Sequence, residues 1–489
     1  MPFLKQPRAA WTIENFLDVK YRQLHINGVS AIDLAREFAT PLFVFSESRI
    51  KQNIERLKKA ESVIDCRLKI CYAAKANSNM AILRTVREAG SDLEVNSGGE
   101  LFKALKIGFK PAQIIFNGTS KTEIELESAI SAGIYAIQSD SLYEIELTEK
   151  VARRLNKKAN VSLRLVPEIE TNTHSGLQTA LLTSKFGMMP DEALKAFCRW
   201  HNAEFLNLCG IHLHIGSQTP DAEPYTEAFK TLFENLVKIY EETNLKLSHI
   251  NLGGGFPINY LRDRAQAADF PHAQQELFSA TLEPVEVLQK AWRGVKEIAE
   301  NANAAHLLKD ITLLLEPGRS VIADAGICLT TVCNRKVRPL QNSKIDSAES
   351  KIQNPKSKIP EDIWLLTDAG FNILLSMETY KWYYQLISAE RADEAHDFPY
   401  KLAGPLCDGG DVYFDIEGQN RLPDYRLLPE NVQPNEILAL LNCGAYSIAQ
   451  MFQYNGRQLP AIVLIKETGE VELIRKRDTF EDLLTNDLF

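Results

Sequence analysis

The chain has 489 residues, of which 45% are hydrophobic and 24% are charged, and its formal net charge is −9. These values are typical of a globular protein with a sizeable core and exclude a largely disordered chain; the length favours two domains. The sequence shows neither a basic stripe nor a run of about 20 apolar residues, so we predict that neither nucleic acid nor membrane is a partner. Eight cysteines without CxxC spacing, and an N-terminal segment without a signal-peptide pattern, predict a cytoplasmic protein.

From about residue 43, short apolar strands alternate with longer amphipathic stretches. Strand–helix alternation is typical of a parallel sheet, and eight such units over about 270 residues favour a closed (β/α)8 barrel. We therefore predict an α/β fold with a barrel over residues 43–320. Its eight strands are expected at 42–45, 68–72, 114–116, 136–138, 161–165, 210–214, 249–252 and 313–315.

The pattern changes from about Val321 onward, where short β-like runs dominate. These runs predict a second, mostly antiparallel β domain. The polar segment 341–361 repeats Ser-Lys-Ile at 343, 350 and 357, which indicates a flexible surface insertion without chemistry. The β-like runs lie at 327–332, 363–366, 436–440 and 461–465.

Two motifs that follow predicted strands are candidates for chemistry: a lysine and a run of glycines. Lys75, in Tyr-Ala-Ala-Lys-Ala-Asn, lies where barrel strands face an active site, and partial desolvation there would give a nucleophilic amine for Schiff-base chemistry. The alternative for Lys75 is a surface lysine in a loop. Gly253, Gly254 and Gly255 follow another strand, and such a turn lets backbone N–H groups approach a phosphate. The alternative is an ordinary tight turn.

Glu316 and Arg319, in Glu-Pro-Gly-Arg, follow the apolar run 313–315. A carboxylate facing a pyridine nitrogen keeps that nitrogen protonated, and an arginine can clamp a phosphate or carboxylate with two hydrogen bonds. The alternative is a structural ion pair at the barrel rim.

A further strand end carries His212, His214 and Ser217, in His-Leu-His-Ile-Gly-Ser-Gln. Histidines at i and i+2 share a strand face, so a metal pair is one interpretation. No further cysteine, histidine or acidic cluster in the sequence completes a metal site, so we predict that no metal ion is bound. An imidazole stacked on an aromatic ring, with Ser217 on a phosphate, fits the neighbouring motifs better.

Four motifs in this order, Tyr-Ala-x-Lys-Ala-Asn, His-Ile-Gly-Ser-Gln, Gly-Gly-Gly-Phe and Glu-Pro-Gly-Arg, resemble the alanine-racemase-fold decarboxylases. This is the group of diaminopimelate decarboxylase and eukaryotic-type ornithine decarboxylase, and the overall resemblance is closest to the former. It extends from about residue 40 to 466 and includes the motifs at 95–101, 185–187, 404–408, 444–446 and 454–457.

The resemblance implies pyridoxal 5′-phosphate as the cofactor and a β domain formed by residues 1–42 and 321–489. Lys75 would form the Schiff base and His214 would stack on the pyridine ring. Glu316 would pair with the pyridine nitrogen. The phosphate would be surrounded by Ser217, Gly253, Gly254, Gly255 and Arg319, with Tyr446 nearby.

The resemblance also implies a homodimer with shared active sites. Cys407 and Asp408 would reach the substrate from a partner subunit, and Cys407 would act in protonating the carbanion after carbon dioxide leaves. The expected substrate contacts are Arg319, Tyr380, Asp408 and Tyr446.

Three positions depart from the pattern of diaminopimelate decarboxylases. Ser376 occupies the place of an arginine that grips the distal end of the substrate, Asp408 replaces a glutamate, and Glu94 replaces an aspartate. Losing a charge-assisted pair to a carboxylate costs roughly 1.5–3 kcal/mol. Two substrate classes therefore stay open: meso-diaminopimelate, which gives L-lysine, and a basic amino acid such as lysine, ornithine or arginine.

Other activities on the same fold are alternatives to decarboxylation. A racemase would have no need of the Cys407–Asp408 motif, and a non-catalytic regulatory homologue would be expected to lose Lys75 or that motif. The sequence therefore favours an enzyme, a pyridoxal-phosphate-dependent decarboxylase that acts on a small-molecule amino acid.

Overall fold

The structure, a computed structural model, describes residues 9–339 and 361–488, apart from residues 167, 170, 172, 175–177, 180 and 182. The chain divides into a barrel unit, formed by residues 50–258 and 280–322, and a β unit, formed by residues 1–49, 259–279 and 323–489. The predicted insertion 341–361 lies outside the described residues except for Glu361, where strand β14 begins. None of the described helices is long and apolar enough to cross a membrane.

Eight parallel strands close into a barrel, in which β12 pairs with β5, so the predicted (β/α)8 barrel is confirmed. The strands have apolar, buried residues because a parallel barrel strand is covered on both sides. In chain order they are β5 (Arg67–Ala73), β6 (Asp92–Val95), β7 (Ile114–Phe116), β8 (Ala136–Ser139), β9 (Ala159–Arg164), β10 (Leu206–His212), β11 (His249–Asn251) and β12 (Thr312–Leu315).

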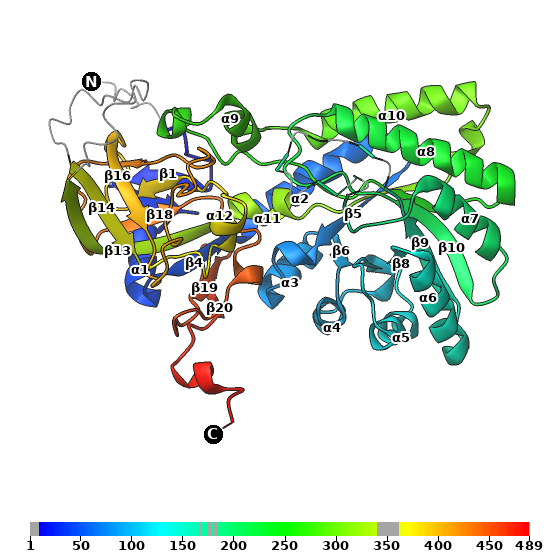
Figure 1. The fold of residues 1–489 in the computed structure, drawn as a ribbon, viewed down its shortest axis with the longest axis horizontal. Coiled ribbons are helices and arrows are strands. Elements are labelled where there is room, and N and C mark those ends of the chain that lie inside the picture. Colours follow the sequence, from blue (N-terminus) through cyan, green and yellow to red (C-terminus); the bar gives the residue numbers. More distant parts are fainter. Residues whose placement is uncertain are drawn as a thin grey trace. The chain divides into compact units, whose positions relative to one another are not determined.

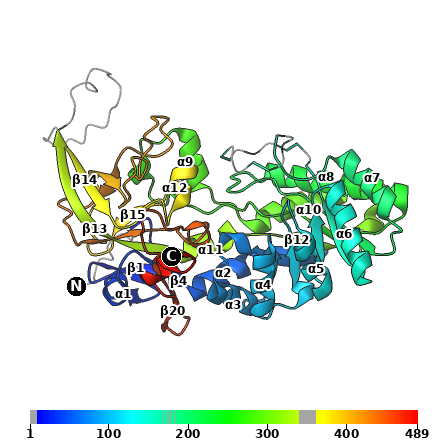
Figure 2. The same ribbon diagram turned by 60° about the horizontal axis from the view of Figure 1, so that its bottom comes forward.

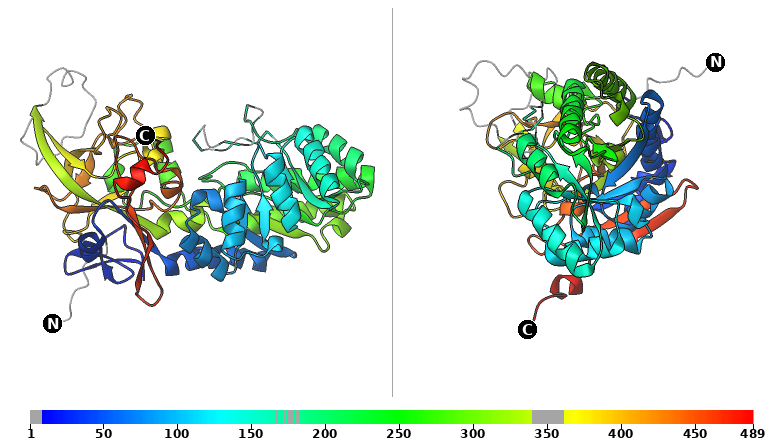
Figure 3. Two further views of the ribbon diagram at one scale, coloured as in Figure 1. Left: turned by 90° about the horizontal axis from the view of Figure 1, so that it is seen from below. Right: turned by 90° about the vertical axis from the view of Figure 1, so that its right-hand side faces the viewer.

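Helices surround the strands, as the right-hand view of Figure 3 shows. Short polar residues start three of them close to a strand end: Ser97, Thr122 and Ser141 each accept a hydrogen bond from the backbone N–H three residues later. These caps fix the loops that lead from the strands. The helices are α2 (Glu47–Lys58), α3 (Met80–Glu88), α4 (Gly98–Lys106), α5 (Glu123–Ala132), α6 (Leu142–Leu155), α7 (Pro190–Trp200), α8 (Glu223–Thr243), α10 (Pro284–Asn301) and the short α11 (Arg319–Ile322) (Figure 1).

The predicted strand at 42–45 was wrong as a barrel strand. It forms β4 (Leu42–Ser46) of the β unit, where it lies between β13 and β19 and is buried throughout. An apolar run buried on both sides looks the same in either setting. The barrel strand that the pattern missed is β6, where Asp92 and Glu94 interrupt the apolar run. Residues 259–279, including α9 (His272–Ser279), also belong to the β unit and not to the predicted barrel range 43–320.

The β unit contains a sheet in the order β17-β16-β14-β13-β4-β19-β20, with β18 pairing β13 and β15. Its pairs are antiparallel except β14 with β16 and β4 with β19; Figure 2 shows β13 and β14 side by side. The predicted β runs fall on β13, β14, β18 and β19. The strands are β13 (Gly326–Pro339), β14 (Glu361–Thr367), β15 (Leu386–Ser388), β16 (Phe398–Ala403), β17 (Arg426–Leu428), β18 (Ile437–Leu440), β19 (Ala461–Ile465) and β20 (Val471–Arg475), and the unit's short helix α12 spans Leu375–Thr379.

The N-terminal segment adds a small antiparallel sheet to the β unit. The sheet has the order β1-β2-β3, and it is followed by helix α1. Apolar residues of this segment share one buried core with β4, β13 and β19. The elements are β1 (Leu17–Lys20), β2 (Gln23–Ile26), β3 (Val29–Ser30) and α1 (Ala31–Phe38).

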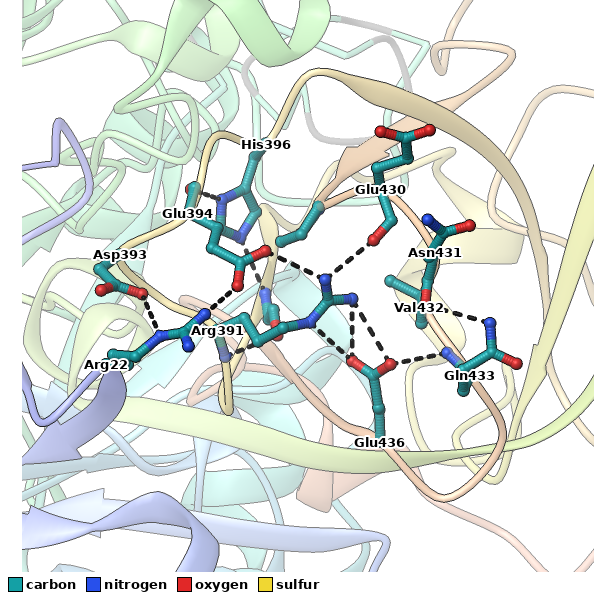
Figure 4. Close-up of polar contacts among 12 residues, drawn as sticks. Arg22, Arg391, Asp393, Glu394, His396, Glu430, Asn431, Val432, Gln433 and Glu436 are labelled. Carbon is teal, nitrogen blue, oxygen red and sulfur yellow. Dashed lines mark hydrogen bonds and ion pairs between the residues drawn. The ribbon is translucent and has the colours of Figure 1, made fainter.

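Arg391 connects two loops of the β unit (Figure 4). Its guanidinium donates to Glu436 Oε2 at 3.1 Å, to Glu394 Oε2 at 3.0 Å and to the carbonyl oxygen of Glu430 at 2.8 Å. Arg22, in the turn between β1 and β2, also pairs with Glu394. The side chain of Arg391 is 22% exposed, whereas that of Arg22 is 61% exposed. Water and salt therefore weaken the ion pairs of Arg22 more than those of Arg391.

We expect Arg391→Ala to lower the free energy of unfolding by about 2 kcal/mol, because it removes four hydrogen bonds of a charged guanidinium from a partly buried site. The midpoint of the thermal transition should then fall by roughly 4–8 °C in a calorimetric scan. The control is Arg22→Ala, which removes only exposed ion pairs and should lower the free energy of unfolding by less than about 1 kcal/mol. Equal shifts for the two variants would contradict this assignment.

Candidate active site

Polar side chains gather at the carboxyl ends of the barrel strands. Because the strands are parallel and closed, these ends meet at one edge of the barrel. Most of the residues concerned are fully or nearly buried, in a part of the barrel that is otherwise apolar. They are Glu94, Asn117, Gln138, Arg164, His212, His214, Asn251 and Glu316, together with Lys75 directly after β5.

Glu316 is held at this edge by hydrogen bonds to both of its carboxylate oxygens. Its Oε1 accepts from Asn251 Nδ2 at 2.6 Å and its Oε2 accepts from Asn117 Nδ2 at 2.8 Å, while His212 Nε2 lies 3.4 Å from Oε2. Burial by itself raises the pKa of Glu316, but attraction to His212 and the hydrogen bonds outweigh it, and the pKa falls well below its usual value. The carboxylate is therefore ionised although it is buried.

His214 has a fixed orientation and no charge. Its Nδ1 accepts a hydrogen bond from the backbone N–H of Gly254 at 3.0 Å, so the proton of the neutral ring is on Nε2. Burial lowers the pKa of His214 well below its usual value, and the positive charge of Lys75 lowers it further. His212 contacts Glu316 instead, so the two histidine rings have separate partners.

The glycine run follows β11 and lies against two other strand ends. A Cβ atom at Gly253 would lie 2.6 Å from His214 Nδ1, one at Gly254 would overlap the carbonyl oxygen of Glu316, and one at Gly255 would lie 2.6 Å from the carbonyl oxygen of Gly216. Gly253 and Gly255 also have positive φ angles, of 65° and 101°. Only glycine fits this loop; Gly253 and Gly254 are buried, and Gly255 is partly exposed.

Ser217 and Arg319 lie together. Arg319 begins α11, and its Nε donates to Ser217 Oγ at 3.1 Å. The guanidinium is buried. A buried guanidinium beside a hydroxyl and a glycine loop is a suitable environment for a phosphate.

Lys75 lies in the short 3₁₀ turn Ala74–Ala76 at the end of β5. Both flanking alanines are buried, as the small-residue pattern predicted, but Lys75 itself is exposed. The partial desolvation of this lysine therefore stays a prediction for the site with its cofactor bound. The positive charge of the lysine nevertheless acts on the buried residues Glu94, His214 and Glu316 of this edge.

Several buried polar atoms at this edge have no hydrogen-bond partner among the described residues. They are Glu94 Oε2, Asn117 Oδ1, both amide atoms of Gln138, Arg164 Nε and His212 Nδ1. Buried polar atoms are normally paired, so this group indicates a polar ligand or ordered water. An amine, an ionised carboxylate, a neutral imidazole, a glycine cradle and an arginine together fit pyridoxal 5′-phosphate.

The remaining predicted site residues, Tyr380, Cys407, Asp408 and Tyr446, belong to the β unit. Cys407 and Asp408 are exposed. The Cys407 backbone N–H donates to Asn455 Oδ1 at 2.7 Å, and Asp408 accepts from Tyr454 Oη at 3.2 Å. The structure therefore brings together the motifs at 404–408 and 454–457, which are far apart in the sequence.

The segment with Ser376 and Tyr380 lies beside the Asp408 turn. A Cβ atom at Gly410 would contact both Asp408 Oδ1 and Glu378 Oε1. Ser376 is buried, and the nearby basic residue, Lys381, is buried and donates to Glu378 Oε2 at 2.8 Å. The positive charge of Lys381 is thus already balanced by Glu378.

Sequence reasoning missed Asn117 and Asn251, the two amides that hold Glu316. Each follows or ends an apolar strand, as a single polar residue at the carboxyl end of β7 or β11. This is the same signal that pointed to Lys75 and Glu316, and applying it to every strand end would have found both asparagines.

Comparison with known proteins agrees with this geometry. Residues 48–323 match the family described as pyridoxal-dependent decarboxylase, pyridoxal binding domain. The chain is 32% identical to a diaminopimelate decarboxylase of Methanocaldococcus jannaschii over 96% of both chains, and 33% identical to one of Aquifex aeolicus over 95% of this chain and 96% of the other. This chain belongs to the pyridoxal-dependent decarboxylases.

Solved structures of decarboxylases share the fold across both units. The crystal structure of the M. jannaschii diaminopimelate decarboxylase superposes with a TM-score of 0.80, at 30% identity, and covers 97% of this chain and 98% of its own. The same enzyme with L-lysine gives a TM-score of 0.79. The decarboxylase described here therefore uses pyridoxal 5′-phosphate and acts on an amino acid.

We expect Gly254→Ala to weaken the binding of pyridoxal 5′-phosphate by roughly tenfold or more, because the added methyl group overlaps the Glu316 backbone and displaces the glycine loop. Fluorescence titration of the decarboxylase with the cofactor measures this. Gly99→Ala is the matched control, since its Cβ would have only Ser97 Oγ nearby, at 3.7 Å. Binding by Gly254→Ala within about twofold of the unchanged protein would contradict the assignment.

Proposed function

We propose that this decarboxylase converts meso-diaminopimelate to L-lysine. The observation that carries the proposal is the match over 96% of the chain to proteins named diaminopimelate decarboxylase, because that match includes the β unit as well as the cofactor-binding barrel. All eight cysteines are unpaired thiols, which supports a reducing compartment, and we place the protein in the cytoplasm.

In this proposal the strand-end residues of the barrel hold the cofactor. The Lys75 amine would bind its aldehyde carbon, Glu316 its ring nitrogen and His214 the face of its ring. When bound, the cofactor supplies an electron sink for the carbanion left by carbon dioxide. The phosphate would be held by Ser217, Gly253, Gly254, Gly255 and Arg319.

The charge states of two side chains support these roles. An ionised Glu316 would keep a proton on the ring nitrogen of the cofactor. The protonated ring withdraws electrons more strongly than the neutral ring. An uncharged His214 can pack against that ring without repelling its positive charge. Burial keeps water away from both groups and strengthens the electrostatic effect.

We further propose a head-to-tail homodimer in which each active site combines the barrel of one subunit with the β unit of the other. Cys407 would give a proton to the substrate carbon, and Asp408, Tyr380 and Tyr446 would contact the substrate, together with Arg319. The exposure of Cys407 and Asp408 supports this role, since both groups are accessible to a partner.

A basic amino acid is the second candidate substrate, favoured by the surroundings of Asp408. Ser376 presents no charge to a distal carboxylate, and Lys381 is already paired with Glu378. Asp408 and Glu378 both lie next to Gly410, so the local charge suits a distal ammonium group better than a distal carboxylate.

Substrate preference is tested by measuring carbon dioxide release from meso-diaminopimelate, L-lysine, L-ornithine and L-arginine with the cofactor-loaded enzyme. We expect kcat/KM for meso-diaminopimelate to exceed the others by at least about tenfold, and Lys75→Ala to lose at least about a thousandfold. A preference for any of the three basic amino acids would replace the first proposal by the second.

Mixing two inactive variants tests the shared site. Lys75→Ala and Cys407→Ala subunits, exchanged at random, should recover about a quarter of the full activity, because half of the dimers are mixed and each mixed dimer has one intact site. Each variant alone is the control. A mixture that stays as inactive as its components, although mass spectrometry shows mixed dimers, would contradict a site built from two subunits.

A further inference from the structure

Glu94 is a second buried carboxyl group beside Glu316, and it has no part in the roles proposed above. It lies on β6 and is fully buried, and its Oε1 accepts from Asn117 Nδ2 at 2.8 Å. The same nitrogen donates to Glu316 Oε2 at 2.8 Å. The two hydrogens of one amide group therefore serve two carboxyl groups from opposite sides.

The two carboxyl groups are not equivalent. Glu316 accepts from two amides and also contacts His212, whereas Glu94 accepts from Asn117 alone and its Oε2 has no hydrogen-bond partner among the described residues. Two like charges this close in a buried site repel each other, so a proton is retained by the less well solvated group. That group is Glu94.

The surroundings of Glu94 support a proton on it near neutral pH. Burial raises the pKa of Glu94 to about 7; Lys75 opposes this rise, and the negative charge of Glu316 adds to it. Below about pH 7 Glu94 is neutral, and above it a second anion appears beside Glu316. The titratable and charged groups that act on Glu94 from neighbouring elements are Cys71 and Lys75 from β5 and the turn after it, Glu100 from α4, Arg164 from β9 and Glu316 from the end of β12.

We propose that Glu94 is a positioning residue of the cofactor site: it shares the Asn117 amide with Glu316, carries a proton on Oε2, and so leaves Glu316 as the single anion of the pair. The longer side chain is essential to this role. The glutamate on β6 reaches the Asn117 amide, which follows the neighbouring strand β7, and an aspartate would be one methylene shorter.

The direct test is infrared spectroscopy of the cofactor-loaded enzyme as a function of pH. In the difference spectrum between the unchanged enzyme and Glu94→Gln, which cancels the bands of other buried acids such as Asp411, we expect the C=O stretching band of one carboxylic acid at about pH 6 and its loss at about pH 8.5. Glu100→Gln is the matched control, because Glu100 is also a partly buried acid near Lys75 but does not contact Asn117. A difference spectrum without such a band, or the same band in the difference between the unchanged enzyme and Glu100→Gln, would overturn the proposal.

Cofactor affinity gives a second readout. Glu316 would face the ring nitrogen of the cofactor, so a second anion beside Glu316 changes the charge that this nitrogen meets. The affinity of the unchanged enzyme for the cofactor, divided by that of Glu94→Gln, should therefore change by about tenfold between about pH 6 and about pH 8.5. A ratio that is constant over this range would overturn the proposal.

Asn117→Ser covers the case in which Glu94→Gln does not fold. Asn117 stabilises the ionised form of Glu94 through its hydrogen bond, so the shorter serine should move the infrared titration to higher pH. An unchanged midpoint would overturn the proposal. None of these measurements depends on which amino acid is the substrate.

Discussion

The hydrogen bonds that Glu316 accepts from Asn117 and Asn251 connect strand ends that are far apart in the sequence. A carboxylate buried without such donors would lose most of the solvation that it has in water. With them, it is an ionised group in a site of low polarity, where its field is strong. The positions of His212 and Glu94 follow from the same constraint, because each contacts Glu316 or shares a donor with it.

The glycine run is held in one conformation beside the Glu316 carboxylate. Gly253 donates its N–H to Asn251 Oδ1 at 2.9 Å, so the residue that holds Glu316 also holds the start of the loop. Gly254 in turn donates to His214. One asparagine thus links the anionic group of the site to the imidazole and the backbone cradle. Electrostatics and geometry are set by the same few contacts, which is the arrangement that efficient catalysis requires.

Much of this could be predicted from the sequence, since strand–helix alternation indicated the barrel, and polar residues after apolar strands indicated Lys75 and Glu316. The limits have physical causes. An apolar run such as Leu42–Ser46 is buried on both faces in either a barrel or a mixed sheet, so periodicity could not assign it. The sharing of Asn117 by Glu94 and Glu316 depends on strand pairing, which brings together residues that no local pattern connects.

The position of β4 has a consequence for the order in which the chain is made. This strand lies between β13 and β19, and both partners follow the whole barrel unit in the sequence. On the ribosome the barrel can therefore be complete while both edges of β4 still have open hydrogen-bonding groups. Unpaired strand edges can form hydrogen bonds with strands of other chains or with the wrong strand of the same chain. Synthesis of the last strands ends this exposure, and a chain that stops before β19 would keep one edge of β4 uncovered.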